Sequence, residues 1–138
     1  AAKMKLTMNF MVGSMTAVLG NALAMMKRNE LDMDQYLDII RHSAFHFGYI
    51  DAKAPRMAER QYDDPNFTAS GMLKDMTHIE QLALEQGVNA QLIHTLCDLY
   101  RQTTTETVSG ASGDFAAIYD VFGNFGGGSD GDGESKKK

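Results

Sequence analysis

The sequence has few of the residues that mark several large classes of protein. It contains one cysteine, Cys97, no tryptophan and two prolines among 138 residues. A single cysteine excludes an internal disulfide framework and offers no zinc-binding spacing, so we interpret Cys97 as a small core residue. His42 and His46 are four residues apart but lack an acidic or thiol partner at ligand spacing, and no metal site is predicted. Neither a P-loop nor a GxGxxG turn between a strand and a helix is present.

Positive charge is also scarce outside the last three residues. The formal net charge is -5 and the pI is about 5.2, and no basic stripe is present that would indicate a nucleic-acid partner. An apolar content of 43% in 138 residues suits one globular domain with its own core, and the ten methionines favour an adaptable helical core. The lone cysteine suits a reducing compartment, cytoplasmic or organellar.

One long stretch near the N-terminus organises the chain. It contains no proline, and no charged residue lies between Lys5 and Lys27. It predicts a single helix from Lys3 to Arg28, about 39 Å long. Its apolar residues lie on most sides, which indicates a buried central helix; a membrane span is the alternative, but polar residues interrupt the run and we expect no membrane partner. A stripe of small residues would let another helix pack closely: Gly13, Ala17 and Gly20.

The rest of the chain has helical periodicity, and no stretch alternates as a strand would. We expect five further helices, the second of them broken or restarted at Pro55: Asp32 to Ser43, Phe45 to Arg60, Phe67 to Gln86, Asn89 to before Gly110, and Asp114 to Phe122. The predicted N-caps are Asp32, Thr68 or Ser70, Asn89 and Asp114. The sequence therefore predicts an all-α bundle built around its long N-terminal helix over residues 1–123. A disordered tail rich in glycine, serine and acidic residues is expected over residues 124–138.

Two polar clusters occupy positions that a core would not choose. Lys5 and Asn9 are four residues apart and share a helix face, and Lys74 and Asp75 are adjacent near the start of the fourth helix. A lysine beside an apolar wall becomes a usable proton donor near neutral pH, and an amide can hold a substrate oxygen. Lys5 could instead be an ordinary lysine at a helix end, and Lys74 with Asp75 a surface ion pair.

Three motifs stand out: AAKMKLTMNFMVGSM at 1–15, NFTASGMLKDM at 66–76 and GDFAAIYDVF at 113–122. Together they resemble the C-terminal helical domain of the β-hydroxyacid dehydrogenases, a family that includes 3-hydroxyisobutyrate dehydrogenase. The resemblance covers roughly residues 1–122 and is closest to the glyoxylate/succinic semialdehyde reductases. It implies an all-α fold like the C-terminal domain of 6-phosphogluconate dehydrogenase.

The resemblance also implies a role for five residues. Lys5 would be the catalytic proton donor to a carbonyl oxygen while NADP or NAD supplies the hydride. Asn9, Phe67 and Asp75 would bind a small aldehyde substrate that carries a carboxylate, and Lys74 would contact the cofactor. In the family an N-terminal Rossmann domain makes most cofactor contacts, and this sequence lacks it. We therefore expect the C-terminal domain of an NAD(P)-dependent oxidoreductase, inactive alone.

A second hypothesis is a non-catalytic helical module that keeps only the dimer-forming helices. Under either hypothesis the small-residue stripe, and the apolar surface left by an absent domain, favour a homodimer or a larger assembly. A neighbouring reading frame that encodes a strand–GxGxxG–helix unit would support the enzyme. A start codon at this N-terminus without such a neighbour would support the module.

Overall fold

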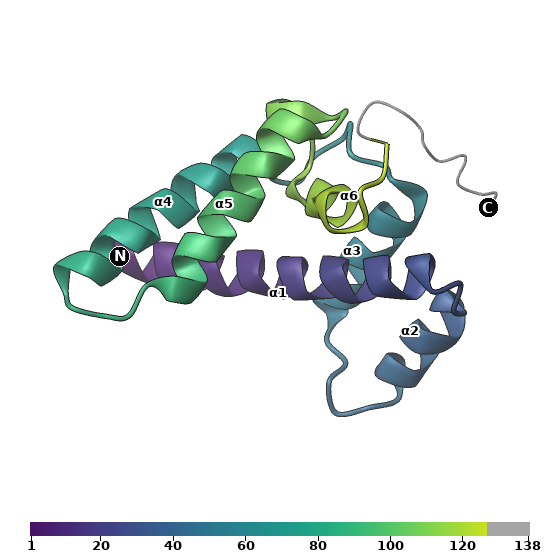
Figure 1. Cartoon of the computed structure of the whole chain (residues 1–138). Coiled ribbons are helices and arrows are strands. Elements are labelled where there is room, and N and C mark those ends of the chain that lie inside the picture. The colour runs from purple at the N-terminus through teal and green to yellow at the C-terminus, as the bar shows by residue number, and fades with distance from the viewer. Residues whose placement is uncertain (127–138) are drawn as a thin grey trace.

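The computed structural model describes residues 1–126, and all regular elements within them are helical (Figure 1). The predicted all-α fold is therefore confirmed for this range, whereas most of the tail predicted over 124–138 lies outside the described residues. The helices are α1 (Ala2–Arg28), α2 (Met33–Arg41), α3 (Gly48–Glu59), α4 (Ala69–Glu85), α5 (Gln91–Glu106) and α6 (Ile118–Gly123), with short 3-10 turns at Gly110–Ser112 and Phe115–Ala117.

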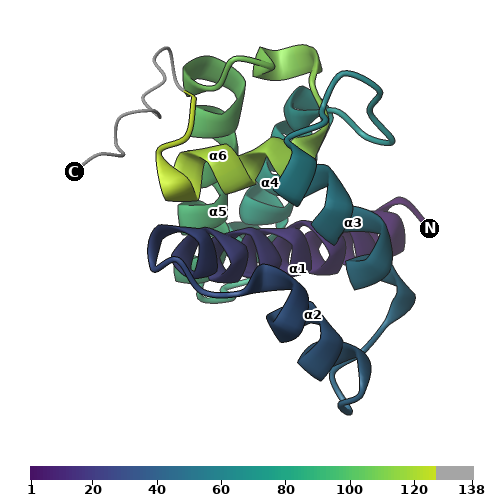
Figure 2. The same ribbon diagram turned by 90° about the vertical axis from the view of Figure 1, so that its right-hand side faces the viewer.

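Helix α1 is the spine against which the other helices pack. α4, α5 and α6 lie on one side of it, and α2 projects from the opposite side near its C-terminal end (Figures 1 and 2). The predicted small-residue stripe is the packing face. A Cβ on Gly13 would lie 2.8 Å from the Met72 sulfur of α4, and a Cβ on Gly20 would lie 3.4 Å from the Tyr119 backbone of α6. Small side chains are therefore required there for the helices to approach.

Only one side of α1 is buried, although the prediction expected burial on most sides. Among the described residues, α4, α5 and α6 cover one side of α1, and most of the large apolar residues on the other side remain at the surface. By length and composition α1 could also cross a membrane, although 39% of its most apolar window is buried in the fold. The exposed large apolar residues of α1 are Met4, Met8, Met11, Val18 and Met25.

Local sequence signals predicted the starts of α2 and α4 correctly but failed inside α3. Asp32 accepts a hydrogen bond from the Gln35 amide and Thr68 from the Gly71 amide, both over 3.0 Å, as predicted for N-caps. The cap predicted at Asn89 was wrong, because α5 has Ala90 at its N-cap and no side-chain cap. The predicted break at Pro55 was wrong, because Pro55 lies inside a continuous α3. Pro55 removes one backbone hydrogen bond, but Ala54 and Met57 on either side of it are buried in the core, and this packing outweighs the loss.

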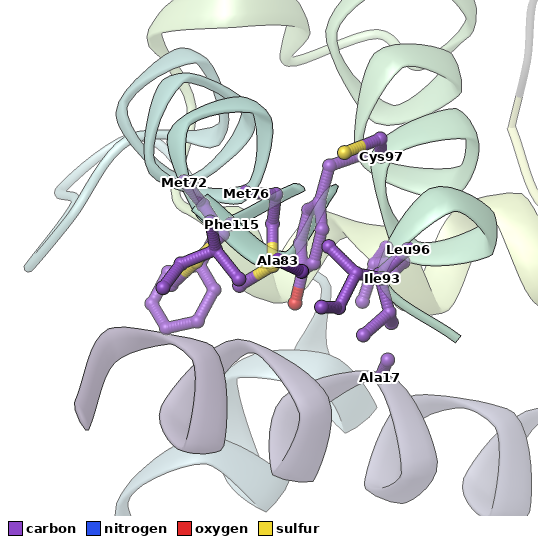
Figure 3. Close-up of a cluster of buried hydrophobic side chains, with 11 residues drawn as sticks. Ala17, Met72, Met76, Ala83, Ile93, Leu96, Cys97 and Phe115 are labelled. Carbon is purple, nitrogen blue, oxygen red and sulfur yellow. The ribbon is translucent and has the colours of Figure 1, made fainter. Parts of the chain in front are cut away.

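Two hydrophobic clusters hold the layers together. The first lies between α1, α4 and α5 and contains Cys97, which is 1% exposed and so is a core residue as predicted (Figure 3). The second fills the space between α1, α3 and α6. The first cluster consists of Ala17, Met72, Met76, Ile79, Ala83, Ile93, Leu96, Cys97, Tyr100, Phe115 and Ile118.

Candidate functional site

The two predicted polar clusters meet through one hydrogen bond between α1 and α4. Asn9 lies one turn before Gly13, and its Nδ2 donates to Asp75 Oδ2 over 2.6 Å. A carboxylate only accepts hydrogen bonds, so Asp75 fixes which way the amide of Asn9 points. Both side chains are partly buried. The second N–H and the oxygen of the Asn9 amide remain able to bind another molecule.

The two lysines of these clusters are exposed. Within residues 1–126, neither Lys5 nor Lys74 forms an ion pair or a side-chain hydrogen bond, so the surface pair that we considered for Lys74 and Asp75 does not form. The described part of the chain also does not bury Lys5 against an apolar wall. Lys5 of α1 and Lys74 of α4 thus each place an unpaired ammonium group close in sequence to the Asn9–Asp75 contact.

Phe67 is held firmly at the start of α4. Its ring packs edge-on against Phe115, with 5.9 Å between centroids and 81° between planes, and its carbonyl accepts the Phe115 amide over 3.0 Å. A Cβ on Gly71 would lie 3.1 Å from this ring, so the glycine leaves room for it. Phe67 shares the rim of the first core cluster with Leu6 and Phe10, the sequence neighbours of Lys5 and Asn9.

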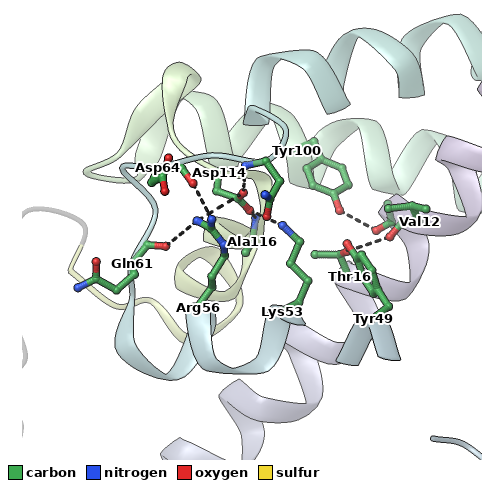
Figure 4. Close-up of polar contacts among 12 residues, drawn as sticks. Val12, Thr16, Tyr49, Lys53, Arg56, Gln61, Asp64, Tyr100, Asp114 and Ala116 are labelled. Carbon is green, nitrogen blue, oxygen red and sulfur yellow. Dashed lines mark hydrogen bonds and ion pairs between the residues drawn. The ribbon is translucent and has the colours of Figure 1, made fainter. Parts of the chain in front are cut away.

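A buried ion pair supports this region, and sequence reasoning missed it (Figure 4). Asp114 Oδ1 accepts from Lys53 Nζ and from the Ala116 amide, both over 2.8 Å, and Oδ2 accepts from the Asn66 amide over 2.9 Å. Arg56 Nη1 lies 3.7 Å from Oδ2. Burial lowers the pKa of Lys53, and the hydrogen bond to Asp114 opposes that shift.

The sequence signals for this pair were incomplete. Asp114 was predicted as a helix cap, and it does accept the Ala116 amide, but nothing in the sequence connects it to a lysine 61 residues earlier. The spacing of Lys53 and Arg56 on one face of α3 was the available clue. Because Asp114 also binds the Asn66 amide, the pair fixes the residue directly before Phe67.

Two grooves formed by described residues lie away from these side chains. An apolar groove of about 300 Å³ lies between α1, α2 and the segment 45–50, and a smaller one of about 190 Å³ lies between α2 and α3. None of the five predicted site residues lines either groove. In residues 1–126 no group of three or more His, Cys, Asp or Glu side chains is placed to hold a metal ion.

Solved structures identify the class of fold. The crystal structure of a 3-hydroxyisobutyrate dehydrogenase from Salmonella typhimurium matches with a TM-score of 0.76 and 16% identity, over 86% of this chain and 41% of that one. A Mycobacterium tuberculosis 3-hydroxyisobutyrate dehydrogenase with L-serine matches with a TM-score of 0.73 and 16% identity, over 86% of this chain and 42% of that one. The chain thus has the fold of part of a hydroxyacid dehydrogenase and spans less than half the length of these enzymes.

A family model then identifies the family. The model described as "NAD-binding of NADP-dependent 3-hydroxyisobutyrate dehydrogenase" matches residues 1–122, and the chain belongs to this family. No curated protein sequence matches the chain. The predicted membership of the β-hydroxyacid dehydrogenases is therefore confirmed at the level of the family.

Proposed function

We propose that this chain is the substrate-binding helical domain of an NAD(P)-dependent oxidoreductase that interconverts small aldehyde acids and hydroxy acids. The reaction would be of the glyoxylate/succinic semialdehyde reductase or 3-hydroxyisobutyrate dehydrogenase type. The main support is the Asn9–Asp75 hydrogen bond, which fixes a polar group on the face that also carries Lys5 one turn earlier. Family membership supplies the reaction class.

The proposed roles follow from the donors and acceptors on this face. The Lys5 ammonium donates a proton to the substrate carbonyl oxygen, since it is exposed and unpaired among the described residues. Asn9 binds a substrate oxygen through the N–H that Asp75 leaves free. Asp75 then acts as a positioning residue through Asn9, which refines the direct substrate contact predicted for it. Phe67 supplies an apolar border.

The cofactor would be held only in part by this chain. Lys74 fits a dinucleotide because its exposed ammonium has no ion-pair partner within residues 1–126 and can donate to ribose or phosphate oxygens. The chain has no glycine-rich phosphate loop, so a Rossmann domain must hold the rest. When bound, NADPH or NADH supplies the hydride. That domain would also cover Lys5 and exclude the water that competes for its proton.

The experiment compares the chain alone with the chain joined behind the dinucleotide-binding domain of a 3-hydroxyisobutyrate dehydrogenase. Oxidation of NADPH and NADH is followed at 340 nm with glyoxylate and with succinic semialdehyde. Reduction of NADP⁺ and NAD⁺ is followed with 3-hydroxyisobutyrate. We expect no turnover by the chain alone and turnover of at least one substrate by the joined protein. Turnover by the 138-residue chain alone would contradict the proposal.

A non-catalytic interaction module is the second candidate, and the exposed apolar face of α1 favours it. Under this proposal the joined protein binds a partner but turns over none of these substrates, although its α-helical circular dichroism is intact. For either candidate we propose a reducing compartment, cytoplasmic or organellar, because the single thiol lies free in the core.

A further inference from the structure

The ring of Phe67 lies against a position of α4 that has no side chain. A Cβ on Gly71 would lie 3.1 Å from two carbons of this ring and 3.1 Å from the Thr68 hydroxyl oxygen. At such a distance the neighbouring atom must move by a few tenths of an ångström. The Thr68 oxygen is held in place because it caps α4 by accepting the Gly71 amide over 3.0 Å. The ring is therefore the group that a larger residue at this position would displace.

The backbone that carries the ring is fixed on both sides. The Phe67 carbonyl accepts the Phe115 amide over 3.0 Å. Two residues later, the Ala69 amide donates to the Gly113 carbonyl over 2.8 Å. The residue before Phe67 is held by its amide hydrogen bond to the Asp114 carboxylate. A displaced ring must therefore move by rotation of the Phe67 side chain, because its backbone cannot shift.

The ring also cannot move toward the core. On that side it packs edge-on against Phe115, which is 2% exposed. Lys53 Nζ lies 4.3 Å from the centre of the Phe115 ring, and Asp114 holds this ammonium group by a 2.8 Å hydrogen bond (Figure 4). A close-packed core has no space for a displaced ring. Phe67 itself is only partly buried, so its ring would move toward its uncovered side.

The position beneath the ring is one helical turn from the Asn9–Asp75 contact. Gly71 precedes Asp75 by four residues, so the two positions share a face of α4 and their Cβ positions are about 6 Å apart. Asp75 in turn accepts the Asn9 amide over 2.6 Å. The residue at position 71 thus determines how far an aromatic ring protrudes close to the amide that Asp75 orients.

We propose that Gly71 is a specificity-determining position: it lets the Phe67 ring lie against α4 and so leaves room beside Asn9 for substrates larger than glyoxylate. Gly71 is a positioning residue, because it acts through the ring. The inference rests on the proposed function, in which Phe67 borders the substrate and Asn9 binds one of its oxygens. In Gly71→Ala the displaced ring would exclude succinic semialdehyde or 3-hydroxyisobutyrate more than the shorter glyoxylate.

Steady-state kinetics of the protein joined to its dinucleotide-binding domain test the proposal. Gly48→Ala is the matched control, since Gly48 also lies in the first turn of a helix and a Cβ there would have nothing within 4 Å. Relative to this control, Gly71→Ala should lower kcat/KM for the larger substrates by about threefold or more, because one methylene in an apolar pocket is worth about tenfold or more and the displacement is smaller. The kcat/KM for glyoxylate should fall clearly less, whereas partial unfolding would lower all values equally.

A second pair of variants tests whether the effect passes through the ring. Phe67→Leu removes the ring carbons that the new methyl group would meet. In this background Gly71→Ala should change the selectivity between substrates much less than it does when the ring is present. An equal change in both backgrounds would overturn the role of the ring.

The packing itself can be measured in the 138-residue chain without any turnover. The ring proton signals of Phe67 in NMR spectra should shift in Gly71→Ala and stay unchanged in Gly48→Ala. Unchanged signals in both, equal selectivity of the two joined variants, or turnover of glyoxylate alone by the unsubstituted joined protein would overturn the inference and leave the proposed function standing. No turnover of any substrate by the unsubstituted joined protein would overturn both.

Discussion

Removing one partner of the buried Lys53–Asp114 pair should destabilise the fold more than other single polar substitutions. The side chains of Lys53 and Asp114 are 4% and 0% exposed, and their charged atoms are 2.8 Å apart. In Asp114→Asn the Lys53 ammonium keeps its burial and loses its counter-charge. The new amide also cannot accept from both Lys53 and the Asn66 amide, because its nitrogen is a donor.

The magnitude follows from the cost of an unpaired buried charge. Breaking such a pair from one side costs about 3–5 kcal/mol. With an unfolding entropy of about 2.1 cal/mol/K per residue, a 138-residue chain has about 0.29 kcal/mol/K, so Tm should fall by about 10–17 °C. The loss for Lys53→Met should lie near the lower end of the 3–5 kcal/mol range, because Arg56 remains 3.7 Å from the carboxylate.

The assay is urea unfolding followed by circular dichroism at 222 nm, for the two single variants and the double variant Lys53→Met with Asp114→Asn. The double variant should lose clearly less free energy of unfolding than the two single variants together, because it contains neither the Lys53 nor the Asp114 charge. The m-value should stay constant. A loss below about 1 kcal/mol for Asp114→Asn, or additive single effects, would refute the reasoning, since surface ion pairs have values of that size.

Three further predictions concern individual side chains. Asp75→Ala should shift the side-chain amide signals of Asn9 in ¹⁵N NMR spectra and cost about 1–2 kcal/mol, and unchanged signals would contradict the hydrogen bond between them. Burial raises the pKa of Cys97 to about 11 from an ordinary value near 9, so the native thiol should resist iodoacetamide at pH 8. The folded state keeps this proton longer than the unfolded state, so stability should fall as pH rises from 9 to 11, and rapid native alkylation would count against this burial. The Glu80 hydrogen bond raises the pKa of His94, so the NMR titration midpoint of His94 should exceed 6.5 and should fall in Glu80→Gln. The stability that this contact contributes should be present below pH 6.5 and lost as pH rises through that midpoint.

The fold was predictable where local signals determine it. Asp32 and Thr68 were readable as caps because a cap depends on a few neighbouring residues. The small-residue stripe on α1 was readable as a packing face because glycines at helical spacing leave room for another helix. Pro55 was misleading because its cost is local while the compensating packing of α3 is tertiary.

The site was predictable only in part. The residue types of Lys5, Asn9, Lys74 and Asp75 were conspicuous, but their spacing did not show that Asn9 would meet Asp75 across 66 residues. The buried Lys53–Asp114 pair was missed because its partners are 61 residues apart, and a charged residue in sequence resembles a surface residue. The exposed half of α1 was also missed, because an apolar residue in sequence does not show whether another helix covers it.

The most direct test of the proposed chemistry compares Lys5→Ala with Lys3→Ala in the protein joined to its dinucleotide-binding domain. The two lysines are exposed and lie two residues apart on α1, so Lys3→Ala controls for loss of charge near the helix end. Loss of a proton donor should lower kcat by about 10²–10⁴-fold with little change in KM. The account predicts this loss for Lys5→Ala and near-normal kcat for Lys3→Ala. Equal kcat values for the two variants would contradict it.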